Sequence, residues 1–165
     1  MNNEITELIQ KIEQWAEDRN LIKGSTPQKQ MLKLMEEFGE LCGGIAKNKP
    51  DVIKNSVGDC AVVLIILAKQ LNFNIVLQTK DGNWYSKTTD YLPYFAVRSA
   101  RLMLDLSERG RTVDEFDFKL TQHYLTYICD QQGFTFTECL ERAWNEIKDR
   151  KGRMVDGFFV KKEDL

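Results

Sequence analysis

The spacing of apolar residues divides this 165-residue chain into six helical segments and two short segments of strand character. Apolar residues recur every three or four positions, the period of an amphipathic helix, over about 3–20, 26–46, 50–71, 90–109, 112–131 and 135–151. Short apolar runs flank Asp81-Gly82 and Asp156-Gly157, and an Asp-Gly pair favours a tight hairpin turn. The pattern therefore predicts an all-α fold with one or two small β-hairpins.

Several of the predicted helices begin with recognisable capping residues. Thr26-Pro27 places a favoured N-cap residue before a proline at the first helical position. Thr112 with Glu115, and Thr135 with Glu138, have the spacing of a capping box. Short loops join the first three helices, so we expect neighbouring helices to pack antiparallel.

Composition and charge exclude several classes of protein. Lys plus Arg number 23 and Asp plus Glu number 25, so the net charge of −2 argues against broad binding to a nucleic-acid backbone. The longest strongly apolar run, 61–68, is far shorter than the roughly 20 residues that span a bilayer. The first residues show no basic start and no apolar signal core. We therefore expect a cytoplasmic protein with no membrane contact.

The four cysteines show no metal-binding spacing. None forms a CxxC pair, and His123 is the only histidine that could join them. We expect each thiol to act as a small buried apolar group in a reducing compartment.

Three carboxylates share one arc of the second helix. At about 100° per residue, Glu36 and Glu40 lie about 40° apart, and Glu37 and Glu40 about 60°. Like charges at this spacing destabilise a helix, and a bound divalent cation would reverse that cost. The alternative is a solvated acidic face without a ligand.

Asp59 is a fourth carboxylate, at the edge of the most apolar run. A carboxylate in such surroundings is costly unless it is paired or binds a metal. If the second and third helices pack antiparallel about Asn48, Asp59 and Glu40 differ in depth by roughly one turn or less. Gly39 and Gly58 neighbour these acids and allow the helices to approach closely.

Basic residues gather near the end of the last predicted helix. Asn145, Lys148 and Lys151 are spaced by three and can face one way, and Arg150 and Arg153 add cationic reach. Such a group would suit a metal-bound polyphosphate. The alternative is that these cations only favour the negative end of the helix dipole.

Together these elements resemble the MazG-like all-α nucleoside triphosphate pyrophosphohydrolases. Their pattern is EExxE on one helix and ExxD on the next, matched here by 36–40 and by Gly58-Asp59, and 145–152 is similar to their terminal nucleotide-binding helix. The resemblance covers roughly residues 5–72 and 135–161.

The resemblance implies a domain organisation. It suggests a single MazG-like domain over 1–165, with a four-helix-bundle-type core at about 3–72 and 135–152. The segment at about 73–133 is then an inserted helical segment, which either covers a nucleotide pocket or adds core and dimer surface. The apolar third helix lies at the bundle centre or in a subunit interface, and we expect a homo-oligomer, a dimer or a tetramer.

The resemblance also implies an activity. Members of the family cleave a (d)NTP to the monophosphate and pyrophosphate with Mg²⁺, for which Mn²⁺ can substitute. Glu37, Glu40 and Asp59 would be metal ligands, Glu36 a further ligand or a residue that orients water, and a metal-activated water would attack the α-phosphorus. The implied substrate-binding residues are Asn145, Lys148, Arg150 and Lys151. Trp15 is a candidate for base stacking, with a place in the core as the alternative.

One position departs from the family pattern. Ser56 stands where the first acid of ExxD would fall, and a hydroxyl is a weaker Mg²⁺ ligand than a carboxylate. Asn55 could supply a carbonyl oxygen in its place. We therefore hypothesise reduced metal affinity. The alternative function is a catalytically weak or inactive helical module that binds nucleotide or another protein.

Overall fold

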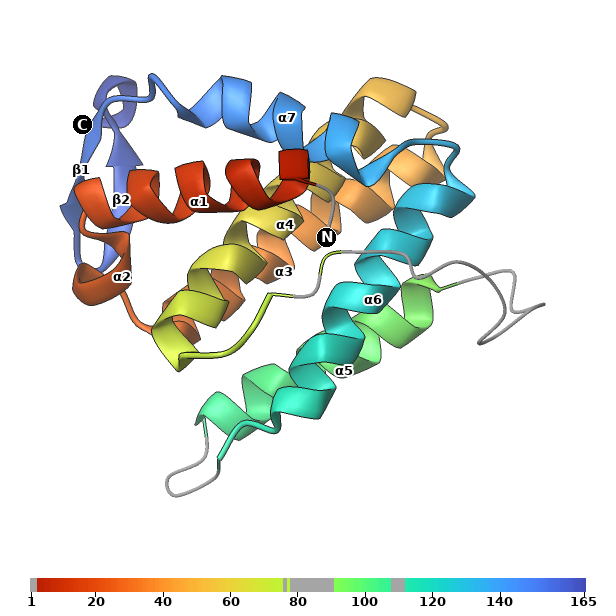
Figure 1. Cartoon of the computed structure of the whole chain (residues 1–165), viewed down its shortest axis with the longest axis horizontal. Helices are drawn as coiled ribbons and strands as arrows, with labels where there is room; N and C mark the ends of the chain where they lie inside the picture. The colour runs from red at the N-terminus through yellow and green to blue at the C-terminus, as the bar shows by residue number, and fades with distance from the viewer. Residues whose placement is uncertain (1–2, 76, 78–90, 108–111) are drawn as a thin grey trace.

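The computed structural model describes residues 3–75, 77, 91–107 and 112–165 (Figure 1). Within this part of the chain there are seven α-helices, one two-stranded sheet and a final 3₁₀ turn. The helices are α1 (Asn3–Asp18), α2 (Leu21–Gly24), α3 (Pro27–Ala46), α4 (Pro50–Leu71), α5 (Leu92–Ser107), α6 (Glu115–Gln131) and α7 (Phe136–Ile147). The remaining elements are β1 (Gly152–Val155), β2 (Phe158–Lys161) and η1 (Lys162–Asp164). The predicted all-α class is confirmed.

The ends of the first helices follow the local signals of the sequence. The Thr26 hydroxyl accepts a hydrogen bond from the Lys29 backbone N–H at 3.3 Å, and Pro27 is the first residue of α3. The short helix α2 was not predicted. It follows Asn20, whose left-handed backbone (φ 58°) turns the chain directly after α1.

One predicted cap is wrong and another is confirmed. Asp114, not Thr112, caps α6, because its carboxylate lies next to the first turn and accepts a hydrogen bond from the Phe116 N–H at 2.8 Å. At α7 the capping box forms as predicted. The Thr135 hydroxyl accepts from the Glu138 N–H, and the Glu138 carboxylate accepts from the Thr135 N–H at 3.0 Å.

The predicted C-terminal hairpin is confirmed, and it pairs Met154 with Phe159. Asp156 and Gly157 both have positive φ, as a tight two-residue hairpin turn requires. The other predicted hairpin, around Asp81-Gly82, lies largely outside the described residues. Ile75 and Leu77, the described residues of its first strand, are not in a strand.

The core is built around α4, which α1, α3, α6 and α7 all contact. In Figure 1, α1 and α7 lie on one side of the α3–α4 pair, and α5 and α6 lie on the other. Every residue from 60 to 68 is buried inside the chain, which places this apolar run at the bundle centre. No helix in the described residues is both long and apolar enough to cross a membrane.

Candidate functional site

The three glutamates of α3 differ in exposure. Glu37 is buried, whereas Glu36 and Glu40 are exposed. The Lys33 ammonium lies 2.6 Å from a Glu37 oxygen and 2.9 Å from a Glu36 oxygen. Burial alone would lower the pKa of Lys33, but its hydrogen bonds with Glu37 and Glu36 raise that pKa above its usual value. A permanent cation therefore already lies between two of the predicted ligands.

Asp59 lies across from these residues on α4. Its carboxylate accepts a hydrogen bond from the Asn55 amide at 2.9 Å. Burial raises the pKa of Asp59 to about 7, and the charges of Glu37 and Glu146 add to this shift. Arg150 and Lys33 act in the opposite direction.

Glu37 and Glu146 both lie close enough to Asp59 for their charges to raise its pKa, so one carboxylate each from α3 and α7 acts on Asp59 of α4. We call Glu37 of α3, Asp59 of α4 and Glu146 of α7 the acidic cluster. The sequence predicted that Asp59 lies near Glu40, and the family resemblance named Glu37 and Asp59 among the metal ligands; Glu146 was not predicted. Glu40 is not among the largest contributors to the pKa shift of Asp59, although it does contribute to raising the pKa of Cys60.

The position of Glu146 follows from a close contact between α4 and α7. A methyl group added at Gly58 would overlap the carbonyl oxygen of Cys139 and would lie 2.8 Å from the Ala143 side chain. The two helices therefore meet almost backbone to backbone beside Asp59, and Glu146 follows Ala143 by about one turn. The small residues at 58 and 143 were the available signal for this crossing.

Two buried oxygen atoms near Asp59 have no hydrogen-bond partner within the described part of the chain. One is the carbonyl oxygen of the Asn55 side chain, and the other is the hydroxyl of the fully buried Ser56. Unpaired buried acceptors are costly. Both are oxygen donors of the kind that Mg²⁺ accepts, so the surroundings of Asp59 fit a hard divalent cation.

The carboxylates do not form a ready-made metal site. Among residues 3–75, 77, 91–107 and 112–165, no three His, Cys, Asp or Glu side chains converge as metal ligands. The contacts above give the reason, since Lys33 holds Glu36 and Glu37 while Asn55 holds Asp59. Metal binding would therefore require Lys33 to move away.

Removing the Lys33 ammonium is expected to strengthen metal binding. The Lys33→Met substitution frees Glu36 and Glu37 from a competing cation and should lower the apparent Kd for Mn²⁺ or Mg²⁺ by about 3–10-fold. Calorimetric titration measures this, with Lys23→Met on α2 as a control that should leave the Kd unchanged. Equal or weaker binding by Lys33→Met would show that Lys33 does not compete with the metal.

A pocket of about 430 Å³ lies beside the exposed carboxylates, at the α3–α4 turn. Its lining residues are Glu36, Gly39, Glu40, Gly43, Gly44, Lys47, Lys49 and Val52. No atom lies within 4 Å of a methyl group added at Gly39 or Gly43, so these glycines leave one face of α3 open. The pocket thus has acidic and basic side chains on its wall and a volume in the range of small-molecule sites.

The cations at the end of α7 are only partly arranged as predicted. The Lys148 ammonium donates to the Asn145 side chain at 2.9 Å, and Arg150 is close enough to Asp59 to lower its pKa. The prediction that Lys151 shares their helix face is wrong, because α7 ends at Ile147. The Arg19 guanidinium donates to the carbonyl oxygens of Lys148 and Arg150, which holds the chain in the turn that follows the helix.

Trp15 lies in the core rather than on an exposed surface. Its indole N–H donates to the Ile147 carbonyl oxygen at 2.8 Å, and its ring meets Phe159 edge-on at 6.1 Å. These contacts join α1 to the end of α7 and to β2. The structure therefore gives Trp15 the core position that was the alternative to base stacking.

Helix α5 lies next to α3. Phe38 of α3 contacts the fully buried Phe95 of α5, with ring centroids 5.0 Å apart. Since Phe38 lies between Glu37 and Gly39, this contact places α5 beside the residues of the candidate site.

Comparison with known proteins gives a family match over α3 and α4. Residues 25–81 match the family model for the MazG nucleotide pyrophosphohydrolase domain. This segment, about a third of the chain, contains α3, α4 and the residues Glu36, Glu37, Glu40 and Asp59. The match confirms the resemblance to the MazG family over this segment.

One protein with a similar sequence is encoded by a bacteriophage. An uncharacterized 18.2 kDa protein in the rep-hol intergenic region of Haemophilus phage HP1 is 68% identical over 75 residues. The matched region covers 46% of this chain and 46% of that protein, so the chain matches about half the length of the relative. No solved structure matches the chain.

Proposed function

We propose that this protein is a Mg²⁺-dependent pyrophosphohydrolase that cleaves a (d)NTP to the (d)NMP and pyrophosphate. The observation that carries the proposal is the proximity of Glu37 and Asp59, on adjacent helices, within the segment that matches the MazG domain. Arg150 lies close enough to Asp59 to lower its pKa and offers positive charge to a phosphate chain.

The proposed metal ligands are Glu37, Glu40 and Asp59, with Glu36 as a further ligand or as the residue that orients the attacking water. The unpaired Asn55 carbonyl oxygen is an additional donor next to Asp59. When bound, Mg²⁺ supplies charge stabilisation for the phosphate oxygens and lowers the pKa of a water molecule. Mn²⁺ accepts the same oxygen donors.

The remaining roles fall to side chains around the acidic cluster. Arg150 and Lys148 neutralise the polyphosphate, and Asn145 orients Lys148 through their hydrogen bond. Water attacks the α-phosphorus and pyrophosphate leaves. Lys151 contributes to this proposal only as an exposed cation of the segment between α7 and β1.

We also propose a homo-oligomer, a dimer or a tetramer, acting on a nucleotide pool in the cytoplasm. Exposed apolar side chains on α5 support an interface between copies, since Tyr94, Val97 and Leu104 recur at helical spacing and are 45–65% exposed. The apolar run of α4 is buried within one chain, so it does not support an interface between copies.

A substrate panel tests the proposed activity. The protein is incubated with each dNTP, each NTP and dUTP in the presence of Mg²⁺, and monophosphate and pyrophosphate are measured. We expect turnover of one or a few substrates, reduced at least about 100-fold by Glu40→Gln because a ligand charge is lost. Glu7→Gln, on the exposed face of α1, is the matched control. If no nucleotide releases pyrophosphate with either Mg²⁺ or Mn²⁺, the proposal fails.

The buried Ser56 favours a second candidate function. Its hydroxyl is fully buried without a partner in the described chain, at the position where the family pattern has a carboxylate. A protein with one ligand fewer could retain the helical scaffold and bind nucleotide or another protein with little or no turnover.

The Ser56→Glu substitution tests whether the missing carboxylate at position 56 weakens Mg²⁺ binding. The added carboxylate should lower the Mg²⁺ concentration for half-maximal activity by about tenfold, since more ligand charge tightens cation binding. Where the wild-type protein shows no turnover, the readout is Mg²⁺ affinity by calorimetry. Ser56→Gln matches the added size without the charge, and circular dichroism checks folding of both variants. An unchanged Mg²⁺ dependence in Ser56→Glu contradicts the idea that Ser56 weakens the metal site.

A further inference from the structure

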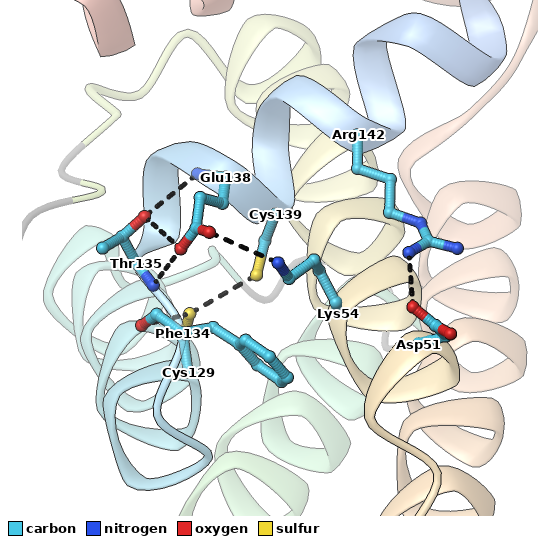
Figure 2. Close-up of polar contacts among 8 residues, drawn as sticks. All are labelled: Asp51, Lys54, Cys129, Phe134, Thr135, Glu138, Cys139 and Arg142. Carbon is cyan, nitrogen blue, oxygen red and sulfur yellow. Dashed lines mark hydrogen bonds and ion pairs between the residues drawn. The ribbon is translucent and has the colours of Figure 1, made fainter.

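Two of the four cysteines lie next to each other where α6 meets α7. The Sγ atoms of Cys129 and Cys139 are 3.5 Å apart, and both residues are fully buried. Figure 2 shows the two side chains directed toward each other, beside the Thr135–Glu138 capping box and with Lys54 of α4 alongside. This geometry brings two thiols into direct contact across a helix junction.

A small movement would bring these sulfur atoms to bonding distance. A disulfide bond is about 2.05 Å long, so the Sγ atoms need to approach by about 1.5 Å. The connection between α6 and α7 is short and includes Gly133, whose positive φ and open surroundings leave the chain room to adjust. Cys129 would give up a weak hydrogen bond from its thiol to the Phe134 carbonyl oxygen at 3.4 Å.

We propose that Cys129 and Cys139 are an oxidation site that closes to an intrachain disulfide when the protein meets a peroxide. One thiol first takes an oxygen atom from the peroxide and becomes a sulfenic acid, while the peroxide is reduced to an alcohol or to water. The second thiol then attacks the sulfenic sulfur, the S–S bond forms, the S–O bond breaks, and the hydroxyl leaves as water. In total, two thiols lose two electrons and two protons to one peroxide.

The bond would join the inserted helix α6 to α7. This inference does not depend on the proposed hydrolase activity, because it uses neither the acidic cluster nor a metal. The two remaining cysteines provide an internal comparison, since Cys60 is fully buried and Cys42 is half-buried. The contact with Cys139 and, next, burial raise the pKa of Cys129, so its reaction should be slow compared with that of an exposed thiolate.

Mass spectrometry tests the proposal on the wild-type chain. Reduced, folded protein is treated with hydrogen peroxide, then denatured and alkylated, and the alkylated thiols are counted. We expect two alkylated thiols instead of four. Trypsin does not cut between Cys129 and Cys139, because no Lys or Arg lies between them. Both therefore lie in one peptide, 120–142. After oxidation this peptide should be two hydrogen atoms lighter than its dithiol form, and a phosphine reductant should restore the two hydrogen atoms.

Variants and thermal unfolding sharpen the test. Cys60→Ser should retain the two-hydrogen loss, and Cys139→Ser should abolish it. Closing this short loop should raise Tm by about 5–10 °C in the oxidised protein. The proposal is overturned if four thiols remain alkylated after oxidation, if the bond forms only in denatured protein, or if Cys42 is found in the bond instead.

Discussion

Without divalent metal, the Asp59→Asn variant is expected to be more stable than the wild-type protein at pH 8, by about 2–4 kcal/mol. The pKa of Asp59 is raised to about 7 by burial and by the charges of Glu37 and Glu146, against the opposing effect of Arg150 and Lys33. Above pH 7 the folded protein therefore holds a half-buried, ionised carboxylate under the influence of two others. Asparagine has nearly the same shape and no charge.

The expected pH dependence has a definite sign. Between the unfolded pKa of 3.8 and the folded pKa of about 7, the folded state binds the proton of Asp59 more tightly than the unfolded state. The wild-type free energy of unfolding should therefore fall as pH rises through this window, by about 1.4 kcal/mol per pH unit. The difference between Asp59→Asn and the wild type should nearly vanish near pH 4.

Urea unfolding at pH 4, 6 and 8 in the presence of EDTA measures this dependence. Asp149→Asn, at an exposed position just after α7, is a matched control that should follow the wild-type curve. An Asp59→Asn curve parallel to that of the wild type across this range would mean that Asp59 ionises normally in the folded protein.

The same substitution should remove the proposed function. Mg²⁺ should restore stability to the wild-type protein at pH 8, because the cation offsets the repulsion among Glu37, Asp59 and Glu146. Asp59→Asn should gain little from Mg²⁺ and should lose turnover. A residue that destabilises the ligand-free protein but is required for activity when the ligand is bound is typical of functional sites. At such sites activity is often retained at the expense of stability.

Local features of the sequence were sufficient to predict most of the fold. Helical periodicity and caps such as Thr26-Pro27 and the Thr135–Glu138 capping box involve residues a few positions apart, so their effects are visible in a short window. An approach of Asp59 to the glutamates of α3 was also predictable, since a short turn joins α3 to α4, although the expected neighbour was Glu40 rather than Glu37. The end of α7 was not, because Arg19, far away in the sequence, binds the carbonyl oxygens there.

The candidate site was harder to predict where it depends on contacts between distant helices. Glu146 reaches the acidic cluster through the crossing of α4 and α7. The small residues Gly58 and Ala143 permit this crossing, but they do not by themselves identify Glu146 as a neighbour of Asp59. Tryptophan is suited both to base stacking and to a place in the core. The hydrogen bond from Trp15 to Ile147 and the contact with Phe159 reveal its place in the core. Lys33 was overlooked because its partners at i+3 and i+4 suggest an ordinary helix ion pair.

The crossing of α4 and α7 should tolerate no side chain at Gly58. An alanine there would overlap the Cys139 carbonyl oxygen, which is backbone and cannot rotate away. We expect Gly58→Ala to lower the free energy of unfolding by about 2 kcal/mol or more, even though alanine is intrinsically favoured over glycine in a helix by about 1 kcal/mol. Urea unfolding of both proteins measures the difference.

Gly43→Ala on α3 is the matched control, because no atom lies within 4 Å of its added methyl group. It should stabilise the protein by up to about 1 kcal/mol. Separating α7 from α4 in Gly58→Ala should also admit water to Asp59. Because burial is the largest cause of the raised pKa of Asp59, the pH dependence of stability should weaken in that variant alone. Equal effects of the two substitutions would contradict a close α4–α7 crossing, and with it the means by which α7 reaches the acidic cluster.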